Sequence, residues 1–421
     1  MAWWIENVRA LQPGEGVVAG AVQISGGKIA ALGPTRGSAE RKPSPPAPLP
    51  KAGEGRIEPS PPVPLPQAGE GRIDGGGRLL TPGLIDIHTH AVGEHGYEAG
   101  PEPLVAAGRL LAQYGTTCVL PTLYQVMRPA HLDELEELGK ALTRVEGVCM
   151  PGFHLEGPFL ALPGAGADTL AGDVGFLEEL IAAAGGRVAA MSVSPETPNI
   201  LPVIERLCQH GIVPFITHTR AGVADTEAAI EAGARHATHF YDVFPVPAET
   251  DPGVRPVGAV EAILADPRCS VDFICDGVHV HPTAIRASLA AKGYQNVMLV
   301  SDSVFGAGLP DGIYESPWGS PIRVSQGDAS RMHCPGCPSH GLIGGSSLTL
   351  DRGMANLLRW LDLPAAQVWA MATRNPARLL GLEGKGVLQP GADADLVLWD
   401  ESGGRLRAVR TWLAGECVFS V

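Results

Sequence analysis

Eight short apolar runs alternate with helix-like segments between residue 84 and about residue 370. We expect these runs to be strands, and they are 84–89, 117–122, 147–153, 188–194, 212–217, 236–239, 270–275 and 296–301. The segments between them, such as 104–115, 131–145, 199–211, 225–233 and 282–293, carry helical spacing of apolar residues. Strands that alternate with helices predict an α/β fold, a TIM-type (β/α)8 barrel, whose functional residues lie at the carboxyl ends of the strands.

Polar side chains close five of these runs, where the mouth of such a barrel would be. They are His88 and His90 after GLIDI, Glu156 in GFHLEGP, His218 after GIVPFIT, His239 after ARHAT, and Asp302 after NVMLVS. Neutral imidazoles and carboxylates are suitable ligands for zinc, and also for iron or manganese. We therefore expect the four histidines and Glu156 to hold one or two divalent ions.

A metal site of this kind suggests hydrolysis. A bound metal lowers the pKa of water from 15.7 to about 7. Asp302, a carboxylate at the end of the last strand, is the candidate general acid and base that moves the proton to a leaving group. A single histidine is more often an ordinary hydrogen-bonded residue, and we assign His95, His131, His210, His236 and His340 to that class.

A second group of possible ligands occurs in MHCPGCPSH and consists of His333, Cys334, Cys337 and His340. A single CxxC without a distant partner pair is a weak zinc signal, so a plain turn is the favoured interpretation and a structural metal the alternative. The eight cysteines are scattered along the chain, mostly in apolar segments. This pattern predicts reduced, buried thiols in a cytoplasmic protein.

The chain ends differ from the barrel segment. Residues 21–33 alternate around Gly-Gly and predict a hairpin. A sixteen-residue unit, 43–58, recurs as 59–74 with three differences, and its proline content predicts an exposed, poorly ordered insertion over 36–74. We expect residues 1–80 and 372–421 to pair into one small β-sandwich domain, and residues 81–371 to form the barrel.

Composition narrows the range of partners. The formal net charge of −14 argues against nucleic acid, which requires a basic face. No apolar run reaches the ~18 residues of a membrane span, and the N-terminus lacks the features of a secretory signal. A small molecule is therefore the expected substrate.

Motifs along nearly the whole chain, apart from the proline-rich insertion, resemble those of the amidohydrolase superfamily and, within it, the N-acetylglucosamine-6-phosphate deacetylases. They include TPGLIDIHTH, HLEGPFL, THTRAG, ATHFYDVF, CDGVHVHP, LVSDSVFGAG and GVLQPGADADLVLWD. The resemblance implies a barrel with one or two metals, Asp302 as the catalytic aspartate, and His279 as a substrate contact. It also implies removal of acetate from a 2-acetamido sugar phosphate, and a homodimer.

Three positions depart from that family's pattern around the substrate. Asp168 stands at or near the place of a substrate-contacting histidine, Asp242 begins Asp-Val-Phe where the family has Asn-Ala-Met, and Thr250 replaces an arginine that contacts phosphate. Arg220 and Arg255 are candidates to compensate. An added carboxylate repels a phosphate dianion, so we hypothesise that deacylase chemistry is retained and phosphate binding is altered.

Two other interpretations remain open at this point. The same metal site could serve an N-acyl-amino-acid hydrolase, a cyclic amidase or an aminohydrolase. Alternatively, the barrel could be a scaffold that binds a protein through the PxxP-like insertion. Deleting residues 43–74 separates these classes, because a hydrolase would keep its activity and a scaffold would lose its partner.

Overall fold

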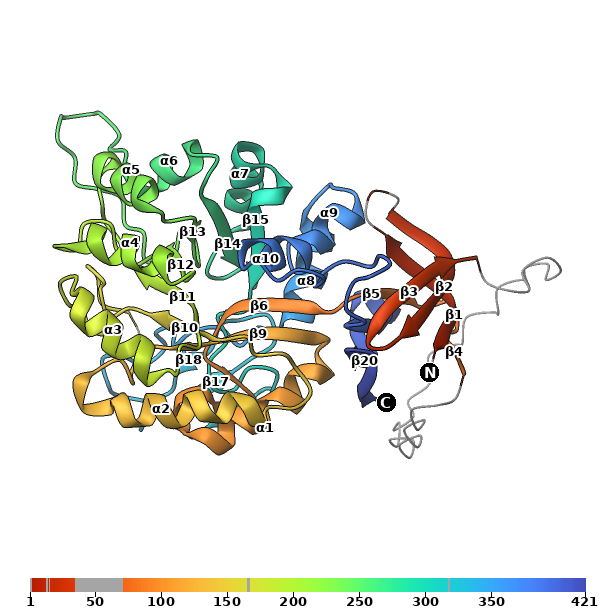
Figure 1. Cartoon of the computed structure of the whole chain (residues 1–421). Helices are drawn as coiled ribbons and strands as arrows, with labels where there is room; N and C mark the ends of the chain where they lie inside the picture. The colour runs from red at the N-terminus through yellow and green to blue at the C-terminus, as the bar shows by residue number, and fades with distance from the viewer. Residues whose placement is uncertain (1, 13, 15, 35–70, 165–166, 317–318) are drawn as a thin grey trace.

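The computed structural model describes residues 2–12, 14, 16–34, 71–164, 167–316 and 319–421. Its two main parts are a barrel of parallel strands with surrounding helices and a β domain built from both ends of the chain (Figure 1). The β domain contains the first strands and the last ones, and both termini lie on its side of the molecule. No helix among the described residues is long and apolar enough to span a membrane.

Eight parallel strands form the barrel wall, as the sequence predicts. In spatial order they are β6 (Leu84–Thr89), β9 (Thr116–Leu123), β10 (Phe153–Glu156), β11 (Val188–Val193), β12 (Val213–Ile216), β13 (His236–Ala237), β14 (Ser270–Ile274) and β15 (Val297–Val300). The last strand returns to the first, where the Asp302 amide donates to the His88 carbonyl at 2.9 Å. The ring brings residues more than 200 positions apart side by side.

One predicted strand lies at a different place. Residues 147–152 of the predicted strand 147–153 are not a regular strand, and β10 begins at Phe153. A single bridge between Cys118 and Cys149 joins the preceding segment to β9. Val148 and Met150 on either side of Cys149 are buried, so this short run packs in the barrel wall although it is too short to form a regular strand.

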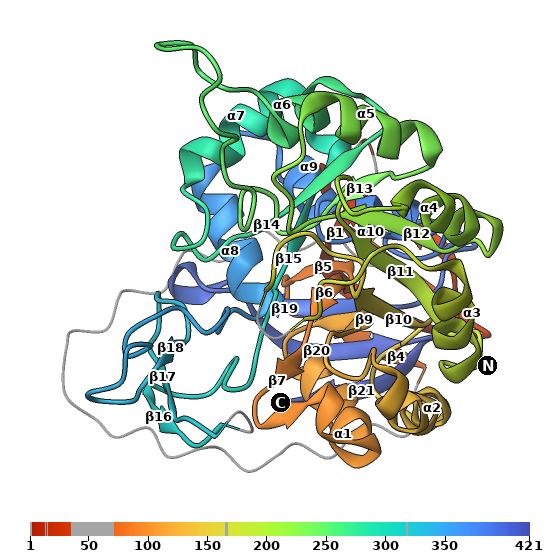
Figure 2. The same cartoon turned by 90° about the vertical axis from the view of Figure 1, so that its left-hand side faces the viewer.

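Helices cover the outside of the barrel (Figures 1 and 2). They are α1 (Pro101–Gln113), α2 (Leu132–Ala141), α3 (Val174–Ala183), α4 (Ile200–Gln209), α5 (Val223–Ala232), α6 (Ala259–Ala265), α7 (Pro282–Lys292), α8 (Leu350–Trp360), α9 (Ala365–Ala370) and α10 (Arg374–Leu379). Local chemistry sets their starts: α1 and α7 begin with proline, and the Asp173 side chain caps α3 by accepting from Gly175 and Phe176 amides. Short 3-10 helices are η2 (Tyr97–Ala99), η3 (Pro129–His131), η4 (Leu142–Arg144), η5 (Tyr294–Asn296) and η6 (Ser402–Gly404).

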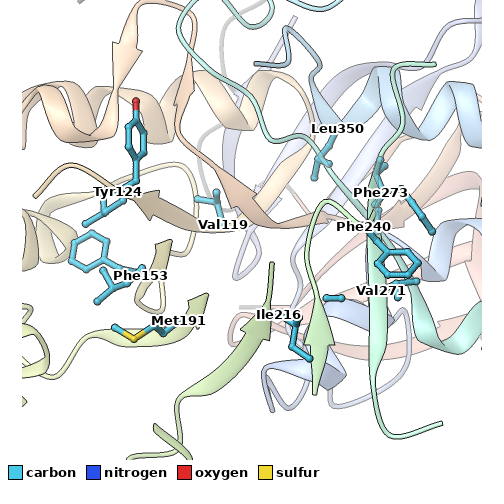
Figure 3. Close-up of a cluster of buried hydrophobic side chains, with 14 of the residues drawn as sticks. Val119, Tyr124, Phe153, Met191, Ile216, Phe240, Val271, Phe273 and Leu350 are labelled. Atoms are coloured by element: carbon cyan, nitrogen blue, oxygen red, sulfur yellow. The ribbon is translucent and has the colours of Figure 1, made fainter. Parts of the chain in front are cut away.

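The main hydrophobic core lies between strands and helices. Val119, Phe153, Met191, Ile216 and Val271 come from strands along the wall and are buried in this layer (Figure 3). The alternate residues of several strands face inward, as a period of two requires, so that His154 and Glu156 of β10 share the inner face. Burial of both faces explains why the strands read as nearly continuous apolar runs.

The two chain ends pair into one hydrogen-bonded sheet, as expected. Its strands are β1 (Trp3–Gln12), β2 (Gly16–Ser25), β3 (Lys28–Gly33), β4 (Arg72–Asp74), β5 (Leu79–Pro82), β19 (Leu396–Asp400), β20 (Arg407–Leu413) and β21 (Glu416–Ser420). The Gly26-Gly27 turn of the predicted hairpin joins β2 to β3. The sheet folds over its own core, so that Trp3 and Trp412 rings lie 6.1 Å apart. Most of the predicted insertion lies outside the described residues, but its last part is ordered as β4, which pairs with β1.

A small three-stranded antiparallel sheet follows β15 and was not foreseen from the sequence. It contains β16 (Gly312–Tyr314), β17 (Ile322–Val324) and β18 (Arg331–Met332), and we call residues 312–316 and 319–345 the cap. A two-stranded hairpin, β7 (Ala91–Val92) and β8 (His95–Gly96), follows β6. Figure 2 shows the cap sheet at one end of the barrel.

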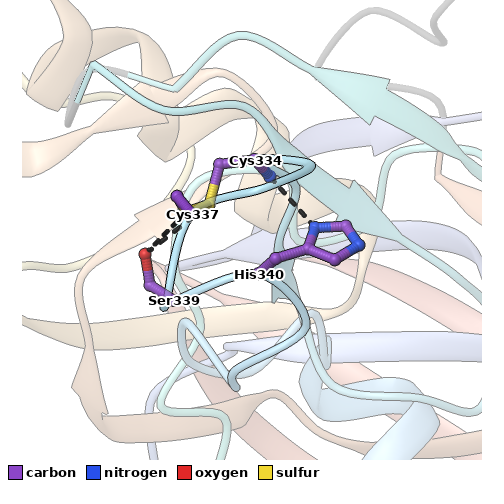
Figure 4. The surroundings of a disulfide bond; sticks show 4 residues. All are labelled: Cys334, Cys337, Ser339 and His340. Carbon is purple, nitrogen blue, oxygen red and sulfur yellow. Dashed lines mark hydrogen bonds between the residues drawn. A yellow bond between two sulfur atoms is a disulfide. The ribbon is translucent and has the colours of Figure 1, made fainter.

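The cap corrects the expectation that all cysteines are reduced and buried. Cys334 and Cys337 form a disulfide, and Ser339 and His340 lie against this loop (Figure 4). The Cys334 amide donates to His340 Nδ1 at 3.2 Å. Of the six free cysteines, Cys208 is exposed. Since the two sulfur atoms bond to each other, the plain-turn interpretation of MHCPGCPSH fits this geometry better than the metal alternative.

Candidate metal centre and active site

The polar residues at the strand ends converge on one centre at the barrel mouth. Glu156 stands in the middle, with Oε1 3.0 Å from Nε2 of both His218 and His239. Its other oxygen, Oε2, lies 3.6 Å from His88 Nε2 and 3.4 Å from His90 Nε2. Each carboxylate oxygen of Glu156 therefore faces one pair of imidazoles.

Asp302 approaches the same centre from β15. Its Oδ1 is 3.5 Å from His88 Nε2 and 3.3 Å from His90 Nε2. Two groups among the described residues have ligand atoms close enough to hold a metal ion, namely His88, His90 and Glu156, and Glu156, His218 and His239. The side chains of the five residues in these two groups are buried or nearly so.

Hydrogen bonds from Nδ1 fix the orientation of three imidazoles. His90 Nδ1 donates to the Thr122 carbonyl at 3.1 Å, and His239 Nδ1 donates to the Asp242 carbonyl at 3.3 Å. His88 Nδ1 lies 2.8 Å from the Thr238 hydroxyl, which itself donates to Asp272 at 3.0 Å. Thr238 therefore accepts from His88, so all three rings leave Nε2 free to coordinate, which is the usual arrangement of metal-binding histidine.

Asp272 and His154 form a supporting layer that sequence reasoning missed. Asp272 also contacts His236 Nε2 at 2.8 Å and accepts from the His239 amide. His154 stacks edge-on against His88 with ring centroids 4.7 Å apart, and its Nδ1 donates to the Ile87 carbonyl. Burial is the main reason that the pKa of His154 is well below its ordinary value. The available signal was alternation, because His154 precedes Glu156 by two residues on one strand.

The electrostatics of the centre favour a cation. Burial by itself lowers the pKa of His90 and His239, yet Asp302 and Glu156 raise the pKa of His90 to about 9, and Glu156 chiefly raises that of His239 to about 10. Burial by itself raises the pKa of both carboxyls, but the imidazoles hold the pKa of Glu156 and of Asp302 well below the usual range. The carboxylates thus create a negative potential that either protons or a divalent metal neutralise. The donor set fits a metal.

Three of these residues have a left-handed backbone. The φ angles of His218, His239 and Asp302 are 47°, 34° and 44°. Such conformations cost about 1 kcal/mol or more in residues other than glycine and tend to cluster at functional sites. Gly164 passes so close to the His218 ring that an added Cβ would lie 1.8 Å from Cε1, so the loop can close over this imidazole only with glycine.

A cavity of about 530 Å³ opens above the centre. His90, Glu156, His218, His239 and Asp302 form its floor. Predicted substrate contacts His279 and Asp242 line its wall, together with Tyr124 and Gly164. The cap contributes Met332, Ser339, Leu342, Ile343, Gly344 and Gly345.

The other two predicted substrate contacts lie elsewhere. The Asp168 carboxylate makes a two-point ion pair with Arg128, at 2.7 and 3.1 Å. Arg220 is exposed, and its backbone amide donates to Glu196. Neither residue is among those that line the cavity.

Comparison with known proteins agrees with this architecture. Residues 79–418 match the model of the amidohydrolase family, and the chain belongs to that family, whose members are metal-dependent hydrolases.

Within the family, the chain resembles the N-acetylglucosamine-6-phosphate deacetylases. It is 32% identical to the enzyme of that name from Vibrio furnissii over 81% of this chain and 83% of the relative. It is 28% identical to the one from Lysinibacillus sphaericus, over 78% and 83% respectively. The solved structure of the Mycobacterium smegmatis deacetylase in complex with N-acetyl-D-glucosamine-6-phosphate superposes with a TM-score of 0.76 at 26% identity, covering 100% of this chain and 99% of that one.

Proposed function

We propose that this protein is a divalent-metal-dependent deacetylase that removes the acetyl group from the nitrogen of an amino sugar. The observation that carries the proposal is the convergence of four imidazoles and two carboxylates from five separated strands beneath one cavity. The similarity to named deacetylases over about four-fifths of the chain supports the acetamido group as the target.

Two ligand sets fit the metal. His88, His90 and Glu156 would hold one ion, and His218, His239 and Glu156 another, with Glu156 shared between them because each of its oxygens faces one imidazole pair. Nitrogen and oxygen ligands in this number suit zinc best, with iron and manganese as alternatives. When bound, such a metal activates water and polarises an amide carbonyl.

Asp302 would move the proton. Its carboxylate lies at the same centre as the imidazoles, and its low pKa keeps it ionised near neutral pH. In that state it can accept a proton from the attacking water at a carboxylate oxygen and then deliver it to the departing amine nitrogen. Without that proton the amine is a poor leaving group.

The cavity wall would orient the sugar. His279 lines the cavity, and its 2.6 Å hydrogen bond to Asp276 holds the imidazole in place; burial by itself lowers the pKa of His279, and the bond to Asp276 raises it. We propose His279 and Asp242 as substrate contacts on this ground. For Asp168 and Arg220, a role would require the substrate to extend beyond the cavity.

The test combines metal content with acetate release. Enzyme stripped by a chelator should lose activity and regain it with zinc, iron or manganese, tested in turn on N-acetylated amino sugars beside N-acyl amino acids. Asp302→Asn should retain the metal and lose activity by at least about a hundredfold, the usual size of a general acid–base contribution. Absence of stoichiometric metal in the reconstituted wild type, or near-normal turnover by Asp302→Asn, would contradict the mechanism.

We further propose a cytoplasmic enzyme that works as a homodimer. Six of the eight cysteines are free thiols, which suits a reducing compartment, and Cys334–Cys337 in the cap is the one disulfide among the described residues. The oligomeric state follows from light scattering of the purified protein, and a monomer under assay conditions would contradict this part of the proposal.

A further inference from the structure

The wall of the cavity beyond the metal ligands combines polar and apolar residues. Asp242 and His279 both line it, and the charge of Asp242 acts on His279. Apolar side chains line it as well, namely Val243, Val304, Met332, Leu342 and Ile343. Leu342 is 59% exposed and Ile343 44% exposed, although both are large apolar residues.

Within the described part of the chain, no lysine or arginine lines this cavity. Two arginines close in sequence to residues of this cavity have other partners. Arg255 pairs with Glu261 at 2.7 Å, and Arg128 pairs with Asp168. Arg220 is exposed outside the cavity. A phosphate group would therefore meet no guanidinium or ammonium group supplied by the described residues of one chain.

Apart from the metal-site residues, His279 is the one imidazole among the described residues that line this cavity, and carboxylates already surround it. Its Nδ1 is hydrogen-bonded to Asp276 at 2.6 Å, and the charges of Asp302 and Asp242 also act on it. Among the described residues, the Asp242 carboxylate itself has no hydrogen-bond or ion-pair partner in the protein. It is therefore available to a ligand.

The chemistry of these walls selects between substrates. An ionised carboxylate only accepts hydrogen bonds, so it pairs with a hydroxyl, whereas a phosphate dianion offers no donor to it. Like charges brought together in a recognition site cost several kcal/mol. Aliphatic side chains suit the C–H faces of a sugar ring and give nothing to a phosphate.

We propose that the substrate is an unphosphorylated N-acetylated sugar, and that Asp242 selects it by accepting a hydrogen bond from a sugar hydroxyl where a phosphate would be repelled. This inference rests on the proposed deacetylase function and names its substrate class.

The experiment measures kcat/KM for acetate release from N-acetylglucosamine and from N-acetylglucosamine 6-phosphate, with the metal-loaded full-length enzyme. Wild type should favour the unphosphorylated sugar by at least about tenfold, and Asp242→Asn should reduce this ratio by a similar factor because it removes the negative charge. Asp251→Asn is the matched control, since it removes the same charge from an exposed residue outside the cavity and should leave the ratio unchanged.

The outcomes separate this inference from the function on which it rests. A preference of the wild type for the phosphorylated sugar would overturn the inference and leave the deacetylase function standing. Because the full-length enzyme is assayed, this result would also cover a phosphate held by a cation from a second copy of the chain. No acetate from either sugar would overturn both. If the preference held but Asp242→Asn kept the wild-type ratio, the selecting role of Asp242 would be wrong.

Discussion

The hydroxyl of Thr238 connects a metal-site imidazole to a buried carboxylate. It donates to Asp272 and accepts from His88 Nδ1, and all three side chains are fully buried. Asp272 in turn holds His236 and the backbone of His239. One hydroxyl thus determines which nitrogen of His88 faces the centre.

Thr238→Val should weaken metal binding by about 10- to 100-fold, because the isosteric methyl group cannot hold the His88 ring in the coordinating tautomer. Competition with a chelator measures the change. Thr226→Val is the control, since the buried hydroxyl of Thr226 in α5 donates to the carbonyl of Gly222, which precedes that helix. Both variants should lose some stability, and equal metal affinity in the two would show that Thr238 has no orienting role.

Asp351, in the first turn of α8, predicts a pH effect on stability. It is buried, its Oδ1 lacks a partner among the described residues, and burial raises its pKa from 3.8 to about 6, against opposing effects of Thr349 and Arg352. The unfolded chain therefore loses this proton more readily than the folded one. The ionised form destabilises the fold above about pH 6, and the penalty disappears below pH 4.

Asp351→Asn should consequently stabilise the protein at pH 8 by about 1–3 kcal/mol, and the gain should disappear by pH 4. Urea unfolding of both proteins at the two pH values measures it. A gain that is the same at both pH values would point to packing rather than to ionisation.

At the scale of elements, the cap supplies apolar cavity wall from a segment with little regular structure. Its strands are two or three residues long, and apart from Met332 of β18 the cap residues that line the cavity follow that strand in a loop. Leu342 and Ile343 remain largely exposed there, so they contribute little to folding. Their exposure has a functional explanation if the substrate covers them.

Leu342→Ser combined with Ile343→Ser should raise KM by about thirtyfold, because burial of each side chain against the sugar would otherwise contribute roughly 1 kcal/mol to binding. The melting temperature should stay close to that of the wild type. Val246→Ser serves as the control, since Val246 is 65% exposed and lies outside the cavity. An unchanged KM in the double variant would remove the cap from the substrate site.

The elements that could be predicted are those with a repeating pattern. The barrel strands carry short, continuously buried apolar runs, so β6, β9 and β11 lie close to their predicted positions. The cap has no such repeat, and its place over the cavity depends on contacts between Phe305, Ile322 and Val324 that no local pattern encodes. Sequence reasoning therefore placed the centre of the site and missed half of its wall.

Individual residues of the site also differ in how far the sequence could predict them. His88 and Asp302 were predictable because strand ends of a barrel share one mouth. The left-handed backbone of Asp302, with a φ of 44°, and the contact of His88 with Thr238 could not be predicted, because both arise when the strands close into a ring. The Arg128 pairing of Asp168 likewise joins residues 40 positions apart in irregular segments.

At the scale of the whole molecule, β19 joins the β domain to the barrel by alternation. Leu396 and Leu398 pack in the core of the β domain, whereas Val397 and Trp399 pack in the core of the barrel. Trp399 is fully buried, donates from Nε1 to the Thr81 hydroxyl at 2.8 Å, and lies 5.6 Å from the Trp369 ring. The two parts thus share one strand.

Trp399→Ala should destabilise the protein by about 3–5 kcal/mol, because it leaves a cavity between the two parts and removes the hydrogen bond that the indole donates to Thr81. Trp399→Phe should cost less, since it keeps most of the packing. Gly115→Ala tests the same contact from the other side: its φ is +74°, and an added Cβ would lie 2.3 Å from the Trp399 ring, so it should also be destabilising. Denaturant unfolding measures all three. The folded fraction of each variant should keep the kcat of the wild type, because Trp399 lies outside the metal site. A Trp399→Ala protein as stable as the wild type would show that the β domain and the barrel do not depend on this contact.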